Sequence, residues 1–541
     1  MNIQFKPLLV SALAATLFFA CGGTSTGVLS TPVENIDSMP LKVSELTEAQ
    51  KHTWGHLDLI TDTIPGMSVN KAYQEIIKNK KGQTTIVAVI DSGIDIDHED
   101  LDDVIWTNSK EIPNNGKDDD NNGYIDDIHG WNFLGDAYNE QLEFVRLLAS
   151  GDKNDPRYAE AEAEYNKEYQ KYTGYKTQYE QILQQVTAAD DAVSSHLKKK
   201  NYTKEEVNAI KTDDASLQQS IAVVKYVYSL DMDSVADFKK EINDGLVEIN
   251  DRLNYNLNKN FNGRKTGDNP NVFNDKPGYG NGNVKPVKKS ESHGTHVAGI
   301  IAAERNNNKG ADGVANNVKI MVIRAVPNGD EYDKDVAHAI RYAVDNGAKV
   351  INGSFGKSYS PHSDWVRDAI AYAAQKDVVF VHAAGNDSVD LDVEYNFPND
   401  QVNNGKEVSD SFITVGSLDP IYGPKMVSGF SNYGKINVDV FAPGGKVYST
   451  TPQNEYDTKG GTSMASPGVA GIAALIRSQY PNLKASQVKD IIINSGIPLT
   501  TKVVVGGDAN NIKSFSTLSK SGKIANAYNA LIMAEKLSKN L

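Results

Sequence analysis

The chain has 541 residues, 39% of them hydrophobic and 23% charged, which is typical of a globular protein rather than a disordered or membrane-embedded one. Lysine and arginine total 55, aspartate and glutamate total 70, and the formal charge is −15. This acidic excess argues against nucleic acid as a partner, because binding to phosphates depends on lysine and arginine. The length allows several domains around one large core.

The N-terminus has the pattern of an export signal. Lys6 precedes the mostly apolar run Leu8–Ala20, which is too short to cross a bilayer core of about 30 Å at about 1.5 Å per residue. The run ends directly before Cys21, the only cysteine, so no intrachain disulfide is expected. With the small residue Ala20 directly before this cysteine, the pattern resembles a bacterial lipoprotein signal, in which Cys21 would become the lipidated first residue.

We therefore predict that residues 1–21 are a signal peptide and that Cys21 anchors an exported lipoprotein to a membrane, on its periplasmic or cell-surface side. The alternative is an ordinary secretory signal with an incidental cysteine. Residues 22–83 are expected to be a tether rich in glycine, serine and threonine, followed by an N-terminal extension with short helices.

From Thr84 onward, apolar runs alternate with helical patterns. The apolar runs lie at 86–90, 318–326, 348–351, 378–384 and 412–416, and the helical patterns at about 295–304, 335–346 and 363–376. This alternation predicts an α/β fold with a doubly wound, mostly parallel sheet, whose ligand sites lie at the carboxyl ends of the strands. We predict one domain from residues 84–135 and 263–500, with a C-terminal extension containing a helix at 501–541.

Residues 136–262 interrupt this alternation and are rich in Glu, Lys, Gln and Tyr. Large side chains recur there with heptad-like spacing, at Tyr158, Tyr165, Tyr172, Tyr175, Tyr179, Ile182 and Val186. The spacing predicts an inserted helical hairpin, with a long helix packed on a second helix near 214–230 or 233–252. Two interpretations stay open: the tyrosines only fill a core, or the segment guards a substrate or binds a partner.

Several polar residues stand where strands end or helices begin. Asp91 follows the first apolar run on a Ser-Gly turn, and Asn386 follows a later one beside glycine. Ser463 begins a buried helix in "GGTSMASP", near free backbone N–H groups that can stabilise an oxyanion. Taken singly, each is also compatible with a capping or turn role. His293 and His296 in "SHGTHVAG" fit either a catalytic base with a neighbour or a metal pair.

The strings "VIDSGID", "SHGTHVAG", "AAGN" and "GTSMASP", in this order on an alternating α/β pattern, resemble the subtilisin-like serine protease family. The resemblance covers about 84–104 and 290–495. It implies a serine endopeptidase that hydrolyses peptide bonds through an acyl-enzyme. In that reading Asp91 orients His293, the general base, while Ser463 is the nucleophile. Asn386 would donate a hydrogen bond to the oxyanion.

The same resemblance implies where a protein or peptide substrate binds. The segment Ser354, Phe355 and Gly356 would pair with an extended peptide as a β-strand. Gly385 and the two alanines before it would form one wall of the pocket for the side chain preceding the scissile bond. Small walls favour a large apolar or aromatic side chain there.

A second candidate site is a loop that reads "NNGKDDDNNGYIDDIHG" at 114–130. Five ligands fall at alternate positions of a calcium-loop template: Asp118, Asp120, Asn122, the carbonyl of Tyr124, and Asp126. His129 stands where an EF-hand has its bidentate glutamate, and Asp127 is a candidate substitute. Because the donors are hard oxygens, we predict structural calcium, with an ion-free acidic turn as the alternative.

Two other functions compete with the peptidase. One is a catalytically silent calcium-binding scaffold or interaction lipoprotein, which has no need to keep the nucleophile, base and oxyanion donor together. The other is a zinc hydrolase using His293 and His296, which lack the i, i+4 spacing and the glutamate of "HExxH".

Overall fold

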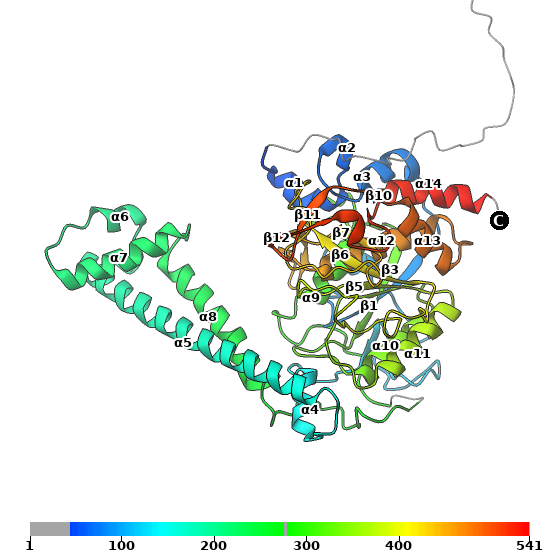
Figure 1. Ribbon diagram of the computed structural model, residues 1–541, viewed down its shortest axis with the longest axis horizontal. Helices are drawn as coiled ribbons and strands as arrows, with labels where there is room; N and C mark the ends of the chain where they lie inside the picture. Colours follow the sequence, from blue (N-terminus) through cyan, green and yellow to red (C-terminus); the bar gives the residue numbers. More distant parts are fainter. Residues whose placement is uncertain (1–43, 275–277, 540–541) are drawn as a thin grey trace, which may run out of the picture. The chain divides into compact units, whose positions relative to one another are not determined.

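The computed structural model describes residues 44–274 and 278–539, so Cys21 and the export signal lie outside the described residues. Within the described part, nine strands form one sheet (Figure 1). From edge to edge they are β10 (Ile497–Pro498), β13 (Lys523–Ile524), β7 (Val440–Pro443), β6 (Phe412–Leu418), β5 (Val379–Ala383), β4 (Val350–Gly353), β1 (Thr85–Asp91), β3 (Val318–Arg324) and β2 (Gly130–Asn132). The strands pair in parallel except β10 with β13, which confirms the predicted doubly wound α/β fold.

The central strands are buried on both faces, as their continuous apolar runs predict. Ala88 and Ile90 of β1 join a core with α10 (Asp333–Asp345) and α11 (Ser363–Gln375), whereas the alternating Val87 and Val89 are fully buried as well. Helices α9 (His293–Ala302) and α12 (Thr462–Gln479) pack on each other and on the strands, and Figure 1 shows α12 across the sheet from α10 and α11.

Residues 44–83 form short helices that pack against the C-terminal part of the chain. These are α1 (Glu48–Thr53), α2 (Leu59–Asp62) and α3 (Val69–Ala72), with η1 (Trp54–His56) and η2 (Tyr73–Ile77). The buried Trp54 donates a hydrogen bond to the Lys446 carbonyl at 2.9 Å, and Asn526 donates one to Ser68 at 2.7 Å. These two bonds tie residues 44–83 to segments about four hundred residues later in the chain.

The C-terminal region adds to the same body. Helix α13 (Ala485–Ser495) packs on α14 (Ala527–Ser538), and α14 also contacts α3. Two small hairpins, β8 (Val447–Thr451) with β9 (Glu455–Lys459) and β11 (Lys502–Val505) with β12 (Asp508–Ser514), flank the sheet. Since β13 belongs to the nine-stranded sheet, the stretch beyond residue 500 contributes to the core.

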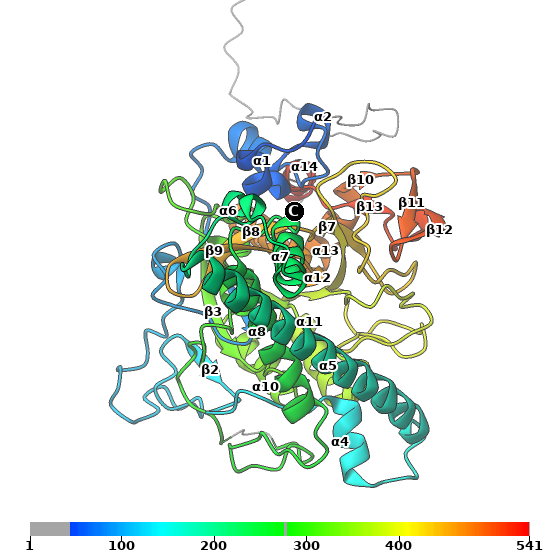
Figure 2. The same ribbon diagram turned by 90° about the vertical axis from the view of Figure 1, so that its left-hand side faces the viewer.

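Helices occupy most of residues 136–262, which we call the helical segment. They are α4 (Glu143–Ser150), α5 (Tyr158–Leu197), α6 (Lys204–Ala209), α7 (Ala215–Ser229) and α8 (Val235–Asp251), followed by η4 (Arg252–Asn256). The 40-residue α5 packs on both α7 and α8, the two windows predicted for its partner, and α5 and α8 lie side by side in both views (Figures 1 and 2). No helix in the described ranges is long and apolar enough to cross a membrane.

The regular spacing along α5 serves two separate cores. Tyr158, Tyr165 and Tyr172 pack against a cluster around Leu142 and Phe144, whereas Ile182 and Val186 join a distal cluster with α6 and α7. Tyr175, between them, is 43% exposed. The stripe is therefore core at both of its ends and exposed at Tyr175 between them.

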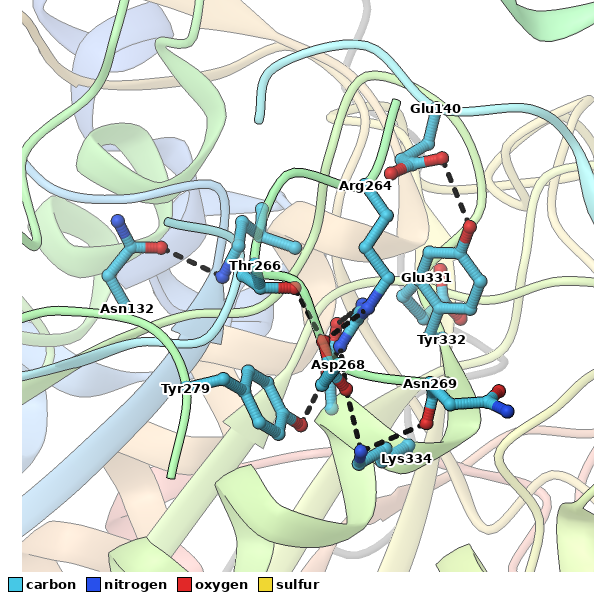
Figure 3. A network of polar contacts seen from close by, with 12 residues as sticks. Asn132, Glu140, Arg264, Thr266, Asp268, Asn269, Tyr279, Glu331, Tyr332 and Lys334 are labelled. Atoms are coloured by element: carbon cyan, nitrogen blue, oxygen red, sulfur yellow. Dashed lines mark hydrogen bonds and ion pairs between the residues drawn. The ribbon is translucent and has the colours of Figure 1, made fainter. Parts of the chain in front are cut away.

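A polar network holds the chain where it returns from the helical segment (Figure 3). The Arg264 guanidinium pairs with Asp268 at 2.8 Å and with Asp335 of α10 at 2.9 Å. Lys334 Nζ lies 2.6 Å from Asp268, and the Tyr279 hydroxyl donates to Asp335 at 2.7 Å. Because these groups are largely buried, the network fixes the return segment on the first turn of α10.

Candidate active site

Asp91 and His293, which are 202 residues apart in sequence, meet at the carboxyl end of β1. His293 Nδ1 lies 2.8 Å and 3.0 Å from the two Asp91 carboxylate oxygens. Asp91 is 1% exposed as the last residue of β1, and His293 is the first residue of α9. A Cβ on Gly294 would lie 2.3 Å from the Gly93 carbonyl oxygen, so glycine at 294 permits this close approach.

The two histidines of "SHGTHVAG" have different surroundings. Desolvation lowers the pKa of His293, but the Asp91 carboxylate outweighs it and raises this pKa above the ordinary value of 6.5. His296 is fully buried, its Nε2 is 3.1 Å from the Asp457 carbonyl, and burial lowers its pKa to about 3. The two rings thus bind different partners, and only His293 faces a carboxylate.

A buried ion pair that sequence reasoning missed supports this corner. Arg324, at the end of β3, is fully buried and pairs with Glu291 at 2.8 Å. Its Nε also donates to the carbonyl of Ser92 at 2.9 Å. Arg324 therefore joins the residue after Asp91 to the loop that precedes His293. The only available signal was a charge inside an apolar run, which does not reveal its partner.

Ser463 lies in the first turn of α12, and Pro467 explains part of its setting. Proline has no N–H, so the Ser463 carbonyl four residues earlier receives no helical hydrogen bond from it. The Ser354 hydroxyl donates to that carbonyl instead, at 2.9 Å. Ser463 Oγ in turn donates to the Ser354 carbonyl at 3.1 Å. These reciprocal bonds fix the start of α12 on the segment that follows β4.

Ser466, the other serine of "GTSMASP", lies in the core. It is fully buried, and its hydroxyl lies 3.1 Å from Asn352 Oδ1 and 2.8 Å from Ser354 Oγ. Its position fits a structural role and leaves Ser463 as the hydroxyl at the helix start.

Asn386 follows β5 and is held by the residue before Ser463. Thr462 donates to Asn386 Oδ1 from its backbone N–H at 2.9 Å and from its hydroxyl at 3.1 Å. The Gly385 N–H donates to the Thr462 hydroxyl at 3.0 Å. The two bonds from Thr462 both hold the carbonyl oxygen of the Asn386 amide, so its NH₂ group points away from Thr462. Asn386 is exposed. Thr462 is a positioning residue that the sequence reading did not single out.

The predicted substrate segment follows β4 directly. Phe355 is 8% exposed and belongs to the core that β1 shares with α10 and α11, whereas Gly356 is exposed. The Asn396 amide lies close to both the predicted substrate segment and the predicted pocket wall: a Cβ on Gly356 would lie 2.5 Å from its Oδ1, and one on Gly385 3.4 Å from its Nδ2. Asn396 also donates to the carbonyl of Ala384 at 3.0 Å. A polar amide thus occupies space that small walls alone would leave to a large apolar side chain.

The acidic loop brings together part of the predicted ligand set and one residue outside it. Carboxylate oxygens of Glu111, Asp118 and Asp120 lie within 4.8 Å of one another. Glu111 is 6% exposed, and its Oε2 is buried without a hydrogen-bond partner. An orphaned buried carboxylate oxygen beside two more carboxylates fits a hard cation. The calcium-loop template did not find Glu111, because that template places its closing acid after the loop.

The other predicted ligands of this loop have partners of their own. Asn122 Oδ1 accepts from the Tyr124 N–H at 2.8 Å, and Asn122 Nδ2 donates to Asp127 at 3.0 Å. The Asp126 carboxylate accepts from the backbone N–H groups of Asn115 and Gly116. The structure therefore gathers Glu111, Asp118 and Asp120 but does not bring Asp126 into that cluster.

Comparison with known proteins identifies the family of this chain. The family model of the subtilase family matches residues 82–518. The chain is 41% identical over 241 residues to "Thermophilic serine proteinase" of Bacillus sp. (strain AK1), covering 44% of this chain and 52% of that protein. It is 38% identical to "Subtilisin DY" of Bacillus licheniformis over 229 residues, 41% of this chain and 76% of that protein. It is 32% identical to "Cell wall-associated protease" of Bacillus subtilis (strain 168), over 40% of this chain and 22% of that protein.

The match spans about half of the first of these relatives, most of the second and under a quarter of the third. The family model itself covers well over half of this chain and includes Asp91, His293, Asn386 and Ser463. The chain belongs to the subtilase family and is a subtilisin-like serine protease.

Proposed function

We propose that the protein is an exported serine endopeptidase in which Asp91, His293 and Ser463 form the catalytic triad. The observation that carries this proposal is the pair of short contacts, 2.8 Å and 3.0 Å, between His293 Nδ1 and the Asp91 carboxylate. A carboxylate on Nδ1 fixes the tautomer in which Nε2 is free to accept a proton from a serine.

The reaction begins when the Ser463 hydroxyl gives up its hydrogen bond to the Ser354 carbonyl and donates to His293 Nε2 instead. As Ser463 Oγ attacks the substrate carbonyl carbon, His293 takes its proton, and Asp91 stabilises the imidazolium. The oxyanion receives hydrogen bonds from Asn386 Nδ2 and the Ser463 N–H. When the C–N bond breaks, His293 gives its proton to the leaving amine. A water molecule then attacks the acyl carbon and gives a proton to His293, which returns it to Ser463 Oγ as the acyl-enzyme is hydrolysed.

The substrate lies along Ser354, Phe355 and Gly356 as an added strand, with Gly356 and Gly385 as walls of the pocket before the scissile bond. Phe355 takes part through its backbone, because its side chain is in the core. The Asn396 amide close to Gly356 and Gly385 favours a small or polar side chain in this pocket over a large aromatic one.

Calcium would be held by Glu111, Asp118 and Asp120, with the remaining ligands from the loop that follows. When bound, the ion would cross-link the loop between β1 and β2 without taking part in the chemistry. The test is thermal unfolding with calcium and with a chelator: we expect the chelator to lower the Tm of the wild type. Glu111→Gln should lose this response, and Asp126→Asn should keep most of it. Equal melting curves for the wild type with and without calcium would contradict the site.

At the N-terminus, Cys21 would carry the lipid that anchors the exported chain. The export pattern supports this, and the printed name of one relative, "Cell wall-associated protease", places that protein outside the cytoplasm. Expression of Cys21→Ser should move the protein from the membrane fraction to the soluble fraction. If both forms fractionate alike, the chain has no lipid anchor.

Labelling with a serine-directed fluorophosphonate tests the peptidase itself. Wild-type protein in calcium should be labelled covalently, Ser463→Ala should not, and zinc chelation should change nothing. Ser466→Ala is the matched control, because Ser466 lies one helical turn later and is fully buried, so this variant should still be labelled. Unlabelled wild type would instead favour a catalytically silent calcium-binding scaffold.

A further inference from the structure

A groove of about 580 Å³ lies where the helical segment meets the loop that precedes His293. Helix α5 contributes Tyr172, Tyr175 and Tyr179 to its lining, and the end of α8 with η4 contributes a second set of residues. Ser290, in the loop before His293, also lines it. The groove therefore joins the long helices of the insertion to the loop that carries the proposed catalytic base.

The groove belongs to the same edge of the sheet as Asp91. Asn328, another lining residue, lies in the loop that follows β3, and its N–H donates to the Tyr138 carbonyl at 2.8 Å. Because β3 pairs in parallel with β1, the loop after β3 begins at the end of the sheet that carries Asp91. Strands β3 and β4 lie on opposite sides of β1. The groove is thus on the other flank of Asp91 from the predicted substrate segment, which follows β4.

The chain itself limits how far the groove can be from the proposed base. Ser290 precedes His293 by three residues, and consecutive Cα atoms are about 3.8 Å apart, so their Cα atoms are at most about 11 Å apart. Between them, Glu291 is fixed by the buried Arg324 at 2.8 Å. An extended peptide advances about 3.3 Å per residue, so a substrate held at His293 can enter the groove a few residues from the scissile bond.

The lining has the composition of a surface that binds polypeptides. Tyr175 is 43% exposed, and the Tyr138 hydroxyl lies 3.4 Å from Ser290 Oγ. A Cβ on Gly245 would lie 2.7 Å from Tyr179 Cε1, so glycine at 245 lets this ring lie against α8. Antibody binding loops use the same residue types, because tyrosine offers a large contact area with few rotatable bonds and small polar residues supply hydrogen bonds.

The charges in the groove favour a basic ligand. Within residues 44–274 and 278–539, the lining side chains of Glu248 and Asp251 have no hydrogen bond or ion pair. The Arg252 guanidinium, also in the lining, faces Glu168 at 3.7 Å and lies 5.3 Å from the centre of the Tyr172 ring. Two carboxylates are thus left for cations from a ligand, whereas the guanidinium already has a carboxylate.

Tyrosine rings at and near the groove already bind cations of this chain. Lys288 Nζ lies 3.8 Å from the centre of the Tyr138 ring, and Lys259 Nζ lies 3.9 Å from the centre of the Tyr165 ring. The helical segment as a whole has 23 acidic and 16 basic residues, which adds to the attraction for a basic chain. Lysine or arginine side chains can therefore pair with the carboxylates and lie on the tyrosine rings.

We propose that this groove is a second binding site for protein substrates, which holds an extended basic segment outside the residues next to the scissile bond. The proposal rests on the proposed peptidase function. It gives the exposed middle of α5 a role in retaining long substrates beside the catalytic residues.

The test uses the full exported chain and internally quenched peptides that share one cleavage site. Each peptide carries a tail of about twelve residues, which spans roughly 40 Å when extended, on either the amino or the carboxyl side of that site. The tail contains only glycine and serine, or also lysine and tyrosine, and mass spectrometry identifies cleavage at the shared bond. On one side of the site, the basic tail should raise kcat/KM on the order of tenfold over the neutral tail. Added salt should reduce this ratio.

Tyr175→Ser and Glu248→Gln should each lower the ratio several-fold. The matched control for the tyrosine is Tyr169→Ser, because Tyr169 is also on α5 and is 44% exposed but is not part of the lining. The control for the carboxylate is Glu241→Gln, an exposed glutamate of α8 outside the lining. Both controls should keep the ratio. Each ratio is measured on one preparation, so it does not depend on the fraction of folded enzyme.

The outcomes separate the two proposals. Enzyme that is labelled by fluorophosphonate but cleaves basic-tailed and neutral-tailed peptides at equal rates overturns the groove and leaves the peptidase intact. A ratio that the groove variants and their controls change alike means that the overall negative charge attracts the tail, which also overturns the groove. Protein that is neither labelled nor active overturns the peptidase, and the groove loses its role as a substrate site with it.

Discussion

The catalytic edge of the sheet and the helical segment are built in contrasting ways. We use "catalytic edge" for the carboxyl ends of β1, β4 and β5 with the starts of α9 and α12. Each of its side chains has a specific partner from a distant part of the sequence, as Asp91 has in His293. The helical segment instead repeats one apolar spacing along α5 and is joined at its base to the rest of the described chain by the buried ion pair of Lys357 with Glu143 and by apolar packing around Tyr359.

The contrast indicates that substitutions at the catalytic edge should change activity, whereas substitutions at the base of the helical segment should change stability. At the catalytic edge a substitution of the proposed base or nucleophile should remove activity and leave the fold, because the side chains of His293 and Ser463 are partly exposed on a rigid scaffold. At the base of the helical segment it should remove stability first, because an unpaired buried charge is costly. The following predictions test that separation, from the largest expected effect to the smallest.

His293→Ala should lower kcat by about six orders of magnitude, the scale seen when either serine or histidine is removed from subtilisin itself. At a pH where His293 is neutral, the thermal unfolding curve should change little, since the His293 side chain is 39% exposed and the Ser92 N–H still donates to the Asp91 carboxylate. Peptide hydrolysis and calorimetry on the same preparation check both statements. If the variant lost activity because it had unfolded, the predicted separation between effects on activity and effects on stability would be wrong.

Lys357→Met should lower the free energy of unfolding by about 3–5 kcal/mol, because it leaves the buried carboxylate of Asp333 without its cation and leaves Glu143 paired with Arg146 alone. Chemical denaturation measures the change. Lys240→Met is the matched control: its partner Asp244 lies 2.9 Å away, but the two side chains are 75% and 63% exposed, so stability should not change measurably. Similar losses in both variants would show that burial does not distinguish the two pairs.

Asn386→Ala should lower kcat about 10²–10³-fold with little effect on KM, since in the proposed mechanism the amide donates a hydrogen bond to the oxyanion. Thr462→Val sharpens this prediction. It keeps the size of the side chain but removes the hydroxyl that joins Gly385 to Asn386 Oδ1. We expect a smaller loss in the same direction, because the backbone N–H of residue 462 still holds the amide. If Thr462→Val raised KM alone, Thr462 would serve substrate binding instead.

The sequence predicted the regions of this molecule unequally. The parallel sheet followed from apolar runs bounded by helical patterns, and the presence of a long helix, α5, followed from its tyrosine spacing, because both signals are local periodicities. The four short strings also indicated which residues the structure would place at the catalytic edge, although their chemical roles stay predictions.

The missed contacts have no local signal. Glu291 lies 33 residues from Arg324 and Glu143 lies 214 residues from Lys357, and neither pair follows a helical or strand period. Glu111 was missed because the ligand template extends only forward from Asp118. Long-range polar contacts become visible only when the fold brings the partners together, and they are what fixes both the catalytic corner and the base of the helical segment.

The pH dependence offers the smallest effect and the closest test of the catalytic edge. The proposed mechanism needs neutral His293 as the general base, and Asp91 raises the pKa of His293 above 6.5, so kcat/KM should reach half its maximum above pH 6.5. Stability depends on pH in the opposite direction to activity. Because the pKa of His293 is raised in the folded protein, protonation of His293 favours the folded state. This contribution is fully present below pH 6.5 and is lost as pH rises through the folded pKa.

Activity should therefore rise over the same pH interval in which His293 stops stabilising the fold. The difference in Tm between wild type and His293→Gln, followed from pH 5 to pH 9, should be largest at the acid end and shrink as kcat/KM rises. His296→Gln should show no such pH-dependent difference there, because the pKa of His296 is about 3. A Tm difference that grew with pH would mean that burial, rather than the Asp91 carboxylate, dominates the pKa of His293.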